Sequence, residues 1–282
     1  MNLPCLNLRS PIILGSCDLF VTESAVRRFY TPSIGAVVLK TATKAPTLGY
    51  PLPHVARFGD GVLVASGMAN PGIVSMCELA RKLQDLVVIG SVVDPSLAGI
   101  YEQAGVSAIE LNLSCPHNPG GSVPAHTASL VYSSVALAKD VTSLPVFAKL
   151  TGWSCNVVET ARAAQDAGAS AVVVSNLFPG TGYYTGLVCQ DNNYAIGDCL
   201  LGFGHGGYTS RNFLAGVLYM IKLIKSELTI PIIATGGCCA DVDALAQADL
   251  VGASAVETVT PLYLGKNLDL LYNEYLLWKK RI

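Results

Sequence analysis

Eight short apolar runs, rich in β-branched residues, recur along the 282-residue chain and alternate with longer segments of helical period. The runs cover residues 11–15, 36–42, 86–92, 108–114, 145–151, 171–176, 231–237 and 255–260. Runs that are apolar on both faces are typical of strands buried in a parallel sheet. Segments 157–168, 212–226 and 241–249 indicate helices between them. Eight such units predict an α/β fold of the closed (β/α)8 type, the TIM barrel.

An open, doubly wound sheet is the alternative architecture. Its usual mark is a GxGxxG turn after the first strand, whereas the corresponding junction here reads GSCDLFVTES. The chain also shows no linker or break in composition, and a barrel of roughly 250 residues is routinely one domain. We therefore expect residues 1–282 to form a single barrel domain.

Charge and composition exclude several classes of protein. The net charge is −2, and the one cluster of basic residues is the tail 279–281, so a nucleic-acid surface is not expected. No run reaches the about 18 apolar residues that span a bilayer, and the first residues lack the basic start of a signal peptide. We expect a cytoplasmic protein without a membrane partner.

The nine cysteines are scattered, odd in number and without a CxxC pair. This pattern argues against a disulfide framework and against a zinc or iron–sulfur site. No metal is expected in this chain.

Segments 43–60, 115–126 and 177–210 are too long for simple turns, and each follows the carboxyl end of an expected strand. Barrel enzymes build their sites at this end, and long loops there are usually functional. We expect all three to be loops, with 177–210, which is rich in Gly, Tyr and Asn, covering the barrel mouth.

The segment ELNLSCPHNPGG, residues 110–121, ends the fourth expected strand. Strand alternation places Asn112 and Ser114 on one face, and Cys115 begins the following loop. A thiol at this position can transfer a proton if it is exposed and near a positive charge or a good donor. Free cysteines are often simply buried, so a structural role is the alternative at this stage.

The same segment resembles the catalytic loop of the class 1 dihydroorotate dehydrogenases and of the pyrimidine-reducing domain of dihydropyrimidine dehydrogenase. In that family the cysteine exchanges the C5 proton of the pyrimidine ring, while a hydride passes between ring C6 and flavin N5. The resemblance implies flavin mononucleotide (FMN) as cofactor and Cys115 as the acid/base. His117 is closer to the dihydropyrimidine dehydrogenase form, because dihydroorotate dehydrogenases usually have Asn there.

Further motifs extend the resemblance from about residue 8 to 265. Lys40 and Thr41 match a strand end near flavin and substrate, Lys149 in FAKLT matches a lysine that contacts the flavin, and Asn176 matches a substrate-binding asparagine. Charges inside strands are costly, so function is favoured over structure for both lysines. A cation beside the isoalloxazine would stabilise negative charge on the reduced ring.

Glycine pairs mark the phosphate end of the expected site. ATGG at 234–237 and the end of run 255–260 provide the two loops that usually bind phosphate in such barrels, and segment 202–211 resembles a flavin-approaching glycine segment of the family. The expected cofactor-binding residues are Gly15, Ser16, Lys40, Thr41, Asn112, Lys149, Gly206, Gly207, Gly236, Gly237, Val259 and Thr260. The expected substrate-binding residues are Lys40, Gly67, Met68, Asn70, Asn112, His117, Asn176 and Leu177.

Two positions depart from the family pattern on the substrate side. Ala65 stands where relatives carry an asparagine that touches the pyrimidine, with Asn70 available only if the loop shifts, and Leu177 replaces a Ser or Thr. Lost hydrogen-bond partners change ligand discrimination strongly. We also expect His54, His126 and His205 to be surface or loop-packing residues.

The resemblance favours oxidation of dihydroorotate to orotate in pyrimidine biosynthesis, with an external electron acceptor. One alternative is a uracil- or thymine-reducing subunit that draws electrons from a partner subunit. Others are a flavin-binding paralogue with a changed substrate, and a flavin-free lyase or aldolase that uses Lys40 or Lys149 as a Schiff base. The resemblance also implies a homodimer.

Overall fold

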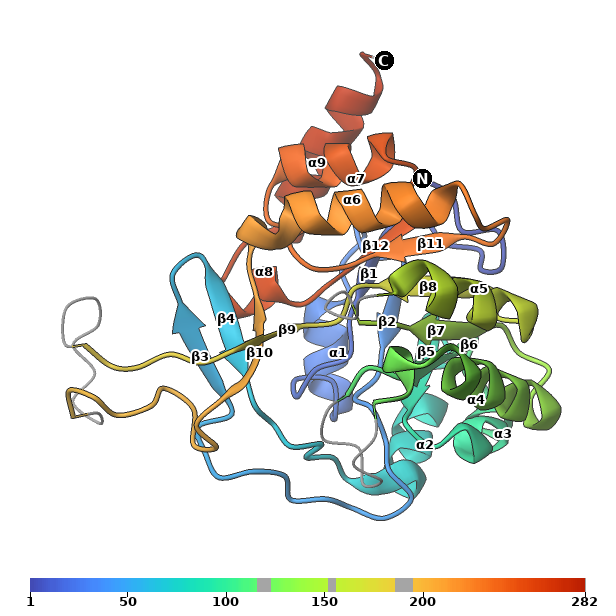
Figure 1. The fold of residues 1–282 in the computed structure, drawn as a ribbon, viewed down its shortest axis with the longest axis horizontal. Coiled ribbons are helices and arrows are strands. Elements are labelled where there is room, and N and C mark those ends of the chain that lie inside the picture. The colour runs from blue at the N-terminus through green and yellow to red at the C-terminus, as the bar shows by residue number, and fades with distance from the viewer. Residues whose placement is uncertain (116–122, 152–155, 186–194, 282) are drawn as a thin grey trace.

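The computed structural model describes residues 1–115, 123–151, 156–185 and 195–281. Its centre is a closed barrel of eight parallel strands in the order β1-β12-β11-β8-β7-β6-β5-β2 (Figure 1). The strands are β1 Ile12–Leu14, β2 Ala36–Val38, β5 Val88–Val92, β6 Ala108–Asn112, β7 Val146–Lys149, β8 Ala171–Val174, β11 Ile232–Ala234 and β12 Ala255–Thr258. Each lies inside one of the eight runs, so the predicted (β/α)8 barrel is confirmed.

Helices surround the barrel (Figure 1). They are α1 Glu23–Phe29, α2 Gly72–Lys82, α3 Ala98–Gln103, α4 Ala128–Val141, α5 Val157–Asp166, α6 Leu214–Lys225, α7 Val242–Leu250, α8 Thr260–Tyr263 and α9 Leu268–Lys279, with 3-10 turns at Pro95–Leu97, Pro124–His126 and Arg211–Phe213. The expected helices within 157–168, 212–226 and 241–249 are confirmed. Asn156 and Asp241 cap α5 and α7 by accepting from backbone N–H groups, which stabilises each helix start. Within the described ranges, no helix combines the length and apolar character needed to cross a membrane.

The barrel interior changes from apolar to polar along the strands. Its amino-terminal part is a buried apolar cluster with at least one side chain from each strand: Ile13, Ala36, Val38, Ile89, Ala108, Phe147, Ala171, Val173, Ile233 and Ala255, closed by Leu3. Because interior side chains alternate along a strand, the next inward positions include Glu110, Lys149 and Glu257. All three are buried polar residues. Polar chemistry is thus confined to the carboxyl-terminal end of the barrel.

A second, antiparallel sheet of order β3-β4-β10-β9 lies beside the barrel (Figure 1). It comprises β3 Val55–Phe58, β4 Gly61–Val64, β9 Phe178–Gly180 and β10 Gly206–Thr209. The prediction that 43–60 and 177–210 are only loops was therefore wrong. A two-residue turn at Gly59 and Asp60 joins β3 to β4, with Phe58 paired to Gly61. Gly-Asp is a recognised hairpin turn, but its flanking strands are short.

Candidate active site

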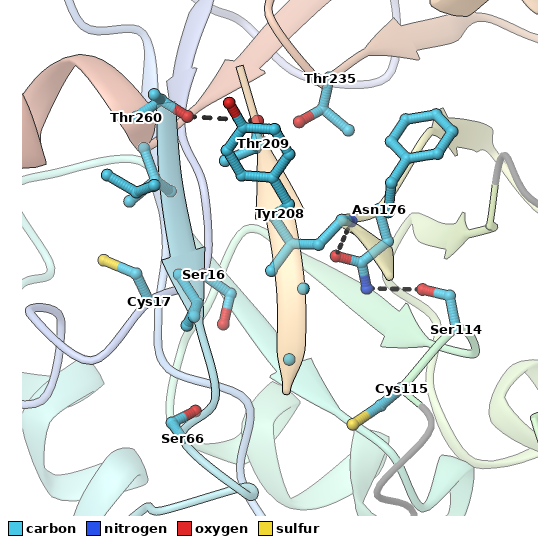
Figure 2. Close-up of a pocket in the computed structure, with 18 of the residues that line it drawn as sticks. Ser16, Cys17, Ser66, Ser114, Cys115, Asn176, Tyr208, Thr209, Thr235 and Thr260 are labelled. Carbon is cyan, nitrogen blue, oxygen red and sulfur yellow. Dashed lines mark hydrogen bonds between the residues drawn. The ribbon is translucent and has the colours of Figure 1, made fainter. Parts of the chain in front are cut away.

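A cavity of about 330 Å³ opens at the carboxyl-terminal end of the barrel strands, against β4 and β10. The residues expected from the sequence that line it are Ser16, Lys40, Thr41, Gly67, Met68, Asn112, Cys115, Lys149, Asn176, Leu177, Gly206, Gly207, Gly236, Gly237, Val259 and Thr260. Figure 2 shows several of these side chains converging from different strands. The structure therefore brings most of the expected residues together.

Two expected residues within the described ranges, Gly15 and Asn70, are not among those that line the cavity. Gly15 instead adjoins Glu257, because a Cβ at residue 15 would lie 2.6 Å from a Glu257 carboxylate oxygen. His117 lies outside the described residues. Asn70 is buried and braces its own loop, since its side chain accepts from Gly72 N at 2.8 Å and donates to Met68 O at 2.7 Å. In this arrangement Asn70 does not border the cavity, and its contact with a ligand stays a prediction.

Cys115 lies where the chain leaves β6. Its side chain is 9% exposed and belongs to a small apolar cluster with Met68 and Val93, and its Sγ is 3.3 Å from Met68 Sδ. Figure 2 shows the sulfur directed toward the centre of the cavity. The thiol is thus shielded from bulk solvent but faces the space where a ligand would bind.

Amide and hydroxyl side chains form a fixed network beside Cys115. Asn176 Nδ2 donates to Ser114 Oγ at 2.6 Å and to Asn112 Oδ1 at 3.3 Å. Asn112 Nδ2 in turn donates to Thr41 Oγ1 at 3.3 Å. Because each amide is held by a neighbour, the network offers donors and acceptors in a defined orientation, which suits recognition of a planar polar ring.

Lys40 forms an ion pair that was not expected from the sequence. Its ammonium donates to Asp18 Oδ1 at 2.5 Å and to Ser66 Oγ at 3.0 Å. The ring of His54 also faces this group, with Nδ1 3.7 Å from Asp18 Oδ2. Asp18 and Ser66 both line the cavity, so the wall around Lys40 carries an ion pair rather than an isolated cation.

His205 lines the cavity, beside the Phe203 ring at a centroid distance of 5.0 Å. His205 is exposed, as expected, and it also borders the cavity mouth. Its position follows from β10, which begins at Gly206 and borders the cavity. The pairing of β10 with β4 joins segments far apart in sequence, which no local pattern indicates.

Lys149 of β7 lies between two buried carboxyl groups, Glu110 of the adjacent strand β6 and Glu257 of β12, which lies farther round the barrel. Its ammonium is 3.4 Å from Glu110 Oε1 and also donates to Glu257 Oε1. Desolvation alone would lower the pKa of Lys149, but its two carboxyl neighbours raise the pKa above the ordinary value. Desolvation and repulsion from Glu257 raise the pKa of Glu110 well above its usual range, against the opposing effect of Lys149. Glu110 is therefore the group that holds a proton.

Neither glutamate was singled out from the sequence, although the signal was present. Both lie in the middle of apolar runs, AIELN and AVETV. A charged group inside a strand is costly to bury, so Glu110 and Glu257 are as unusual in their runs as Lys149 is.

The opposite side of the cavity has features that fit a phosphate-bearing cofactor. Gly236 and Gly237 have φ values of +95° and +82°, a region that glycine adopts readily. Their N–H groups make no hydrogen bond within the described part of the chain, so they are available to an anion.

Ser175 Oγ lines the cavity, is buried and has no partner among the described residues. A buried polar atom of this kind normally acquires a partner. Thr260 Oγ1 donates to Thr209 Oγ1 at 3.3 Å nearby (Figure 2).

Comparison with known proteins first defines the class of fold. A crystal structure of DHODH from Eimeria tenella, in complex with ferulenol, superposes with a TM-score of 0.75 and covers 98% of this chain and 83% of that chain. The sequence identity is 18%, so this likeness shows the barrel fold alone.

Sequence comparison identifies the family. The dihydroorotate dehydrogenase family model matches residues 1–268, and the chain therefore belongs to the dihydroorotate dehydrogenase family. The catalytic subunit of dihydroorotate dehydrogenase B (NAD(+)) from Pyrococcus abyssi is 33% identical over 271 residues, 94% of this chain and 87% of that protein. Dihydroorotate dehydrogenase A (fumarate) from Lactobacillus helveticus is 30% identical, over 91% of this chain and 85% of that protein. The resemblance in the Cys115 segment is thus confirmed at the level of the family.

Proposed function

We propose that this protein is an FMN-dependent dehydrogenase that oxidises dihydroorotate to orotate, with Cys115 as the base. The observation that carries the proposal is the shared cavity. Cys115, the asparagine network and the glycine turns of residues 236–237 meet at one barrel mouth, in a chain that belongs to the dihydroorotate dehydrogenase family.

The residues available for FMN fit its two ends. The free N–H groups of Gly236 and Gly237 would bind the phosphate, together with the loop at Val259 and Thr260. Lys149 would lie beside the ring system, and Ser175 Oγ would gain a hydrogen-bond partner. When bound, FMN supplies hydride acceptance.

The protein side chains would bind the substrate and remove a proton. Asn112 and Asn176 present amide groups that complement the amide and carbonyl groups of the pyrimidine. Dihydroorotate loses a hydride from C6 and a proton from C5 in forming orotate, and Cys115, which lines the cavity, would take the C5 proton as a thiolate. Met68 and Val93, the apolar neighbours of Cys115, would limit the access of water to the thiol.

A specific observation favours an uncharged dihydropyrimidine as the second candidate substrate. Ala65 is buried and its methyl side chain cannot hydrogen-bond. Leu177 lines the cavity and lies close to Gly207, where an added Cβ would be 2.5 Å from the Leu177 Cβ. The charge of Lys40 is already balanced by Asp18. A ring without a carboxylate would therefore be compatible with this wall.

The electrons would leave through an external acceptor or a partner subunit, and we propose a homodimer as the working form. The names of two relatives provide the acceptors to test, NAD(+) and fumarate.

The test measures flavin content and product. The purified protein is supplied with FMN, separated from free flavin and incubated without oxygen with dihydroorotate, dihydrouracil or dihydrothymine. We expect one orotate per bound FMN and little uracil or thymine. The reverse preference would establish the second candidate instead, and a protein that binds no FMN would contradict both.

A further inference from the structure

Three charged residues meet in the barrel interior at the base of the cavity. Glu110 of β6, Lys149 of β7 and Glu257 of β12 have exposed side-chain fractions of 1%, 8% and 3%. Lys149 and Glu257 border the cavity, whereas Glu110 is not among the residues that line it. Glu110 Oε2 has no hydrogen-bond partner in the described ranges. One cation is thus shared by two buried carboxyl groups, an arrangement that the catalytic scheme above does not require.

The fold reserves space for the carboxylate of Glu257. Gly15 directly follows β1, the strand paired with β12. A Cβ at Gly15 would lie 2.6 Å from Glu257 Oε1 and 3.0 Å from Val259 Cγ2. Gly15 does not have a left-handed backbone, so its lack of a side chain is a matter of space rather than of conformation. Any larger residue at position 15 would displace Glu257 from Lys149.

The charges of this cluster cancel. Glu110 retains its proton because burial and Glu257 raise its pKa, which leaves the Lys149 ammonium opposite the Glu257 carboxylate. The adjacent strands add no charge at this level, since Ser91 is in register with Glu110 and Val173 with Lys149. A ligand above Lys149 therefore meets a neutral ion pair, not a free cation. A buried unpaired charge would be strongly unfavourable.

We propose that Glu257 is a positioning residue of the flavin site, which anchors the Lys149 ammonium and cancels its charge toward the bound ring. The consequence is that this site stabilises negative charge on the isoalloxazine less than Lys149 alone would. This inference rests on the proposed function only in taking FMN as the ligand. It does not depend on which pyrimidine is the substrate.

Sulfite provides a test without any pyrimidine. Sulfite adds to oxidised flavin and leaves negative charge on the ring, so its dissociation constant reports how well the site stabilises that charge. Glu257→Gln keeps the shape of the side chain and removes the charge. In FMN-loaded protein we expect at least tenfold tighter sulfite binding and a higher two-electron midpoint potential, by about 30 mV for each tenfold. Glu78→Gln, on the exposed face of α2, is the matched control and should change neither value.

A second measurement examines the cluster in the protein without flavin. At neutral pH, exposed carboxyl groups are ionised, so an infrared band of a protonated carboxylic acid reports a buried acid such as Glu110. We expect this band in the parent and its loss in Glu110→Gln. It should remain in Glu257→Gln, because burial, the largest cause of the raised pKa of Glu110, is unchanged in that variant.

The outcomes separate this inference from the proposed function. Unchanged or weaker sulfite binding in Glu257→Gln, or the absence of the acid band from the parent, would overturn the role of Glu257. Failure to form orotate, with the sulfite and infrared results as expected, would contradict the proposed substrate but not the role of Glu257. If FMN does not bind at all, the infrared result alone decides whether the charge-cancelled cluster exists.

Discussion

Asn176 and Ser114 are joined by a 2.6 Å hydrogen bond across the cavity wall. Asn176 follows β8 and Ser114 follows β6, so this bond connects two barrel strands immediately before Cys115 (Figure 2). Asn176 Oδ1 also accepts from Leu177 N at 2.9 Å. The amide is therefore held in position before any ligand arrives, which lowers the cost of binding.

Replacing Asn176 with Ala should weaken ligand binding and leave FMN content unchanged. Loss of one hydrogen bond in a buried site costs about 1–1.5 kcal/mol, which corresponds to about a tenfold higher dissociation constant for orotate. The measurement is a titration of the FMN-loaded variant with orotate, followed by the flavin absorbance. Ser114→Ala should have a smaller effect, since Asn112 still holds the amide. Equal orotate affinity in parent and Asn176→Ala would exclude Asn176 from the ligand site.

Asp18→Asn should strengthen binding of carboxylated pyrimidines selectively. The substitution frees the Lys40 ammonium from its ion pair, so the cation becomes available to the carboxylate of orotate. We expect the dissociation constant of orotate to fall by roughly tenfold, equivalent to about 1.4 kcal/mol, and that of uracil to stay the same. The two ligands are titrated in parallel. A similar change for both would show that Asp18 acts through packing rather than charge.

Gly237→Asp should abolish FMN binding. A Cβ at this position would lie 2.6 Å from Ser210 O, and the φ of +82° strains any other residue. The added carboxylate would in addition repel the phosphate. Gly204→Asp is the control for backbone strain, because Gly204 has a similar φ of +89° but nothing within 4 Å of the added Cβ. The flavin-to-protein ratio and the Tm are measured for both. Retention of FMN by Gly237→Asp would contradict the proposed phosphate site.

The barrel and the position of Cys115 could be predicted because their signals are local. Strand patterns depend on neighbouring residues, and the segment 110–121 is continuous. The ion pair between Asp18 and Lys40 could not be predicted, since it depends on how the loop after β1 folds toward β2. The second sheet was also missed, because Val64 of β4 pairs with Gly207 of β10 across a long stretch of chain.

Glu110 and Glu257 are a different case. Each places an ionisable side chain within an apolar strand, so the sequence marked them as unusual. What it did not show is that both side chains point inward at the level of Lys149. This depends on the strand stagger in the closed barrel and on the absence of a side chain at Gly15.

Lys149→Met should destabilise the protein, because it leaves buried carboxyl groups without their cation. Removing one partner of a buried pair costs about 3–5 kcal/mol. A buried carboxyl without its cation binds its proton more tightly in the folded than in the unfolded state. The loss in free energy of unfolding should therefore grow as pH rises above the pKa of the glutamate in the unfolded chain, about 4.3. The double variant Lys149→Met, Glu257→Gln should recover much of the stability. Denaturant unfolding at several pH values measures this. A cost independent of pH would contradict the charged cluster.

The most direct test of the proposed reaction is the rate at which dihydroorotate bleaches the bound flavin in Cys115→Ala under anaerobic conditions. A positioned proton acceptor commonly contributes about 10²–10⁴-fold, so we expect a loss of this size with FMN content and orotate affinity preserved. Cys115→Ser should retain part of the rate, increasing toward high pH, because a hydroxyl is a weaker acid. Cys5→Ala, at the opposite end of the barrel beside the Leu3 cluster, should bleach at the parent rate. Bleaching of Cys115→Ala at the parent rate would contradict the account, since the C5 proton would then leave through another group.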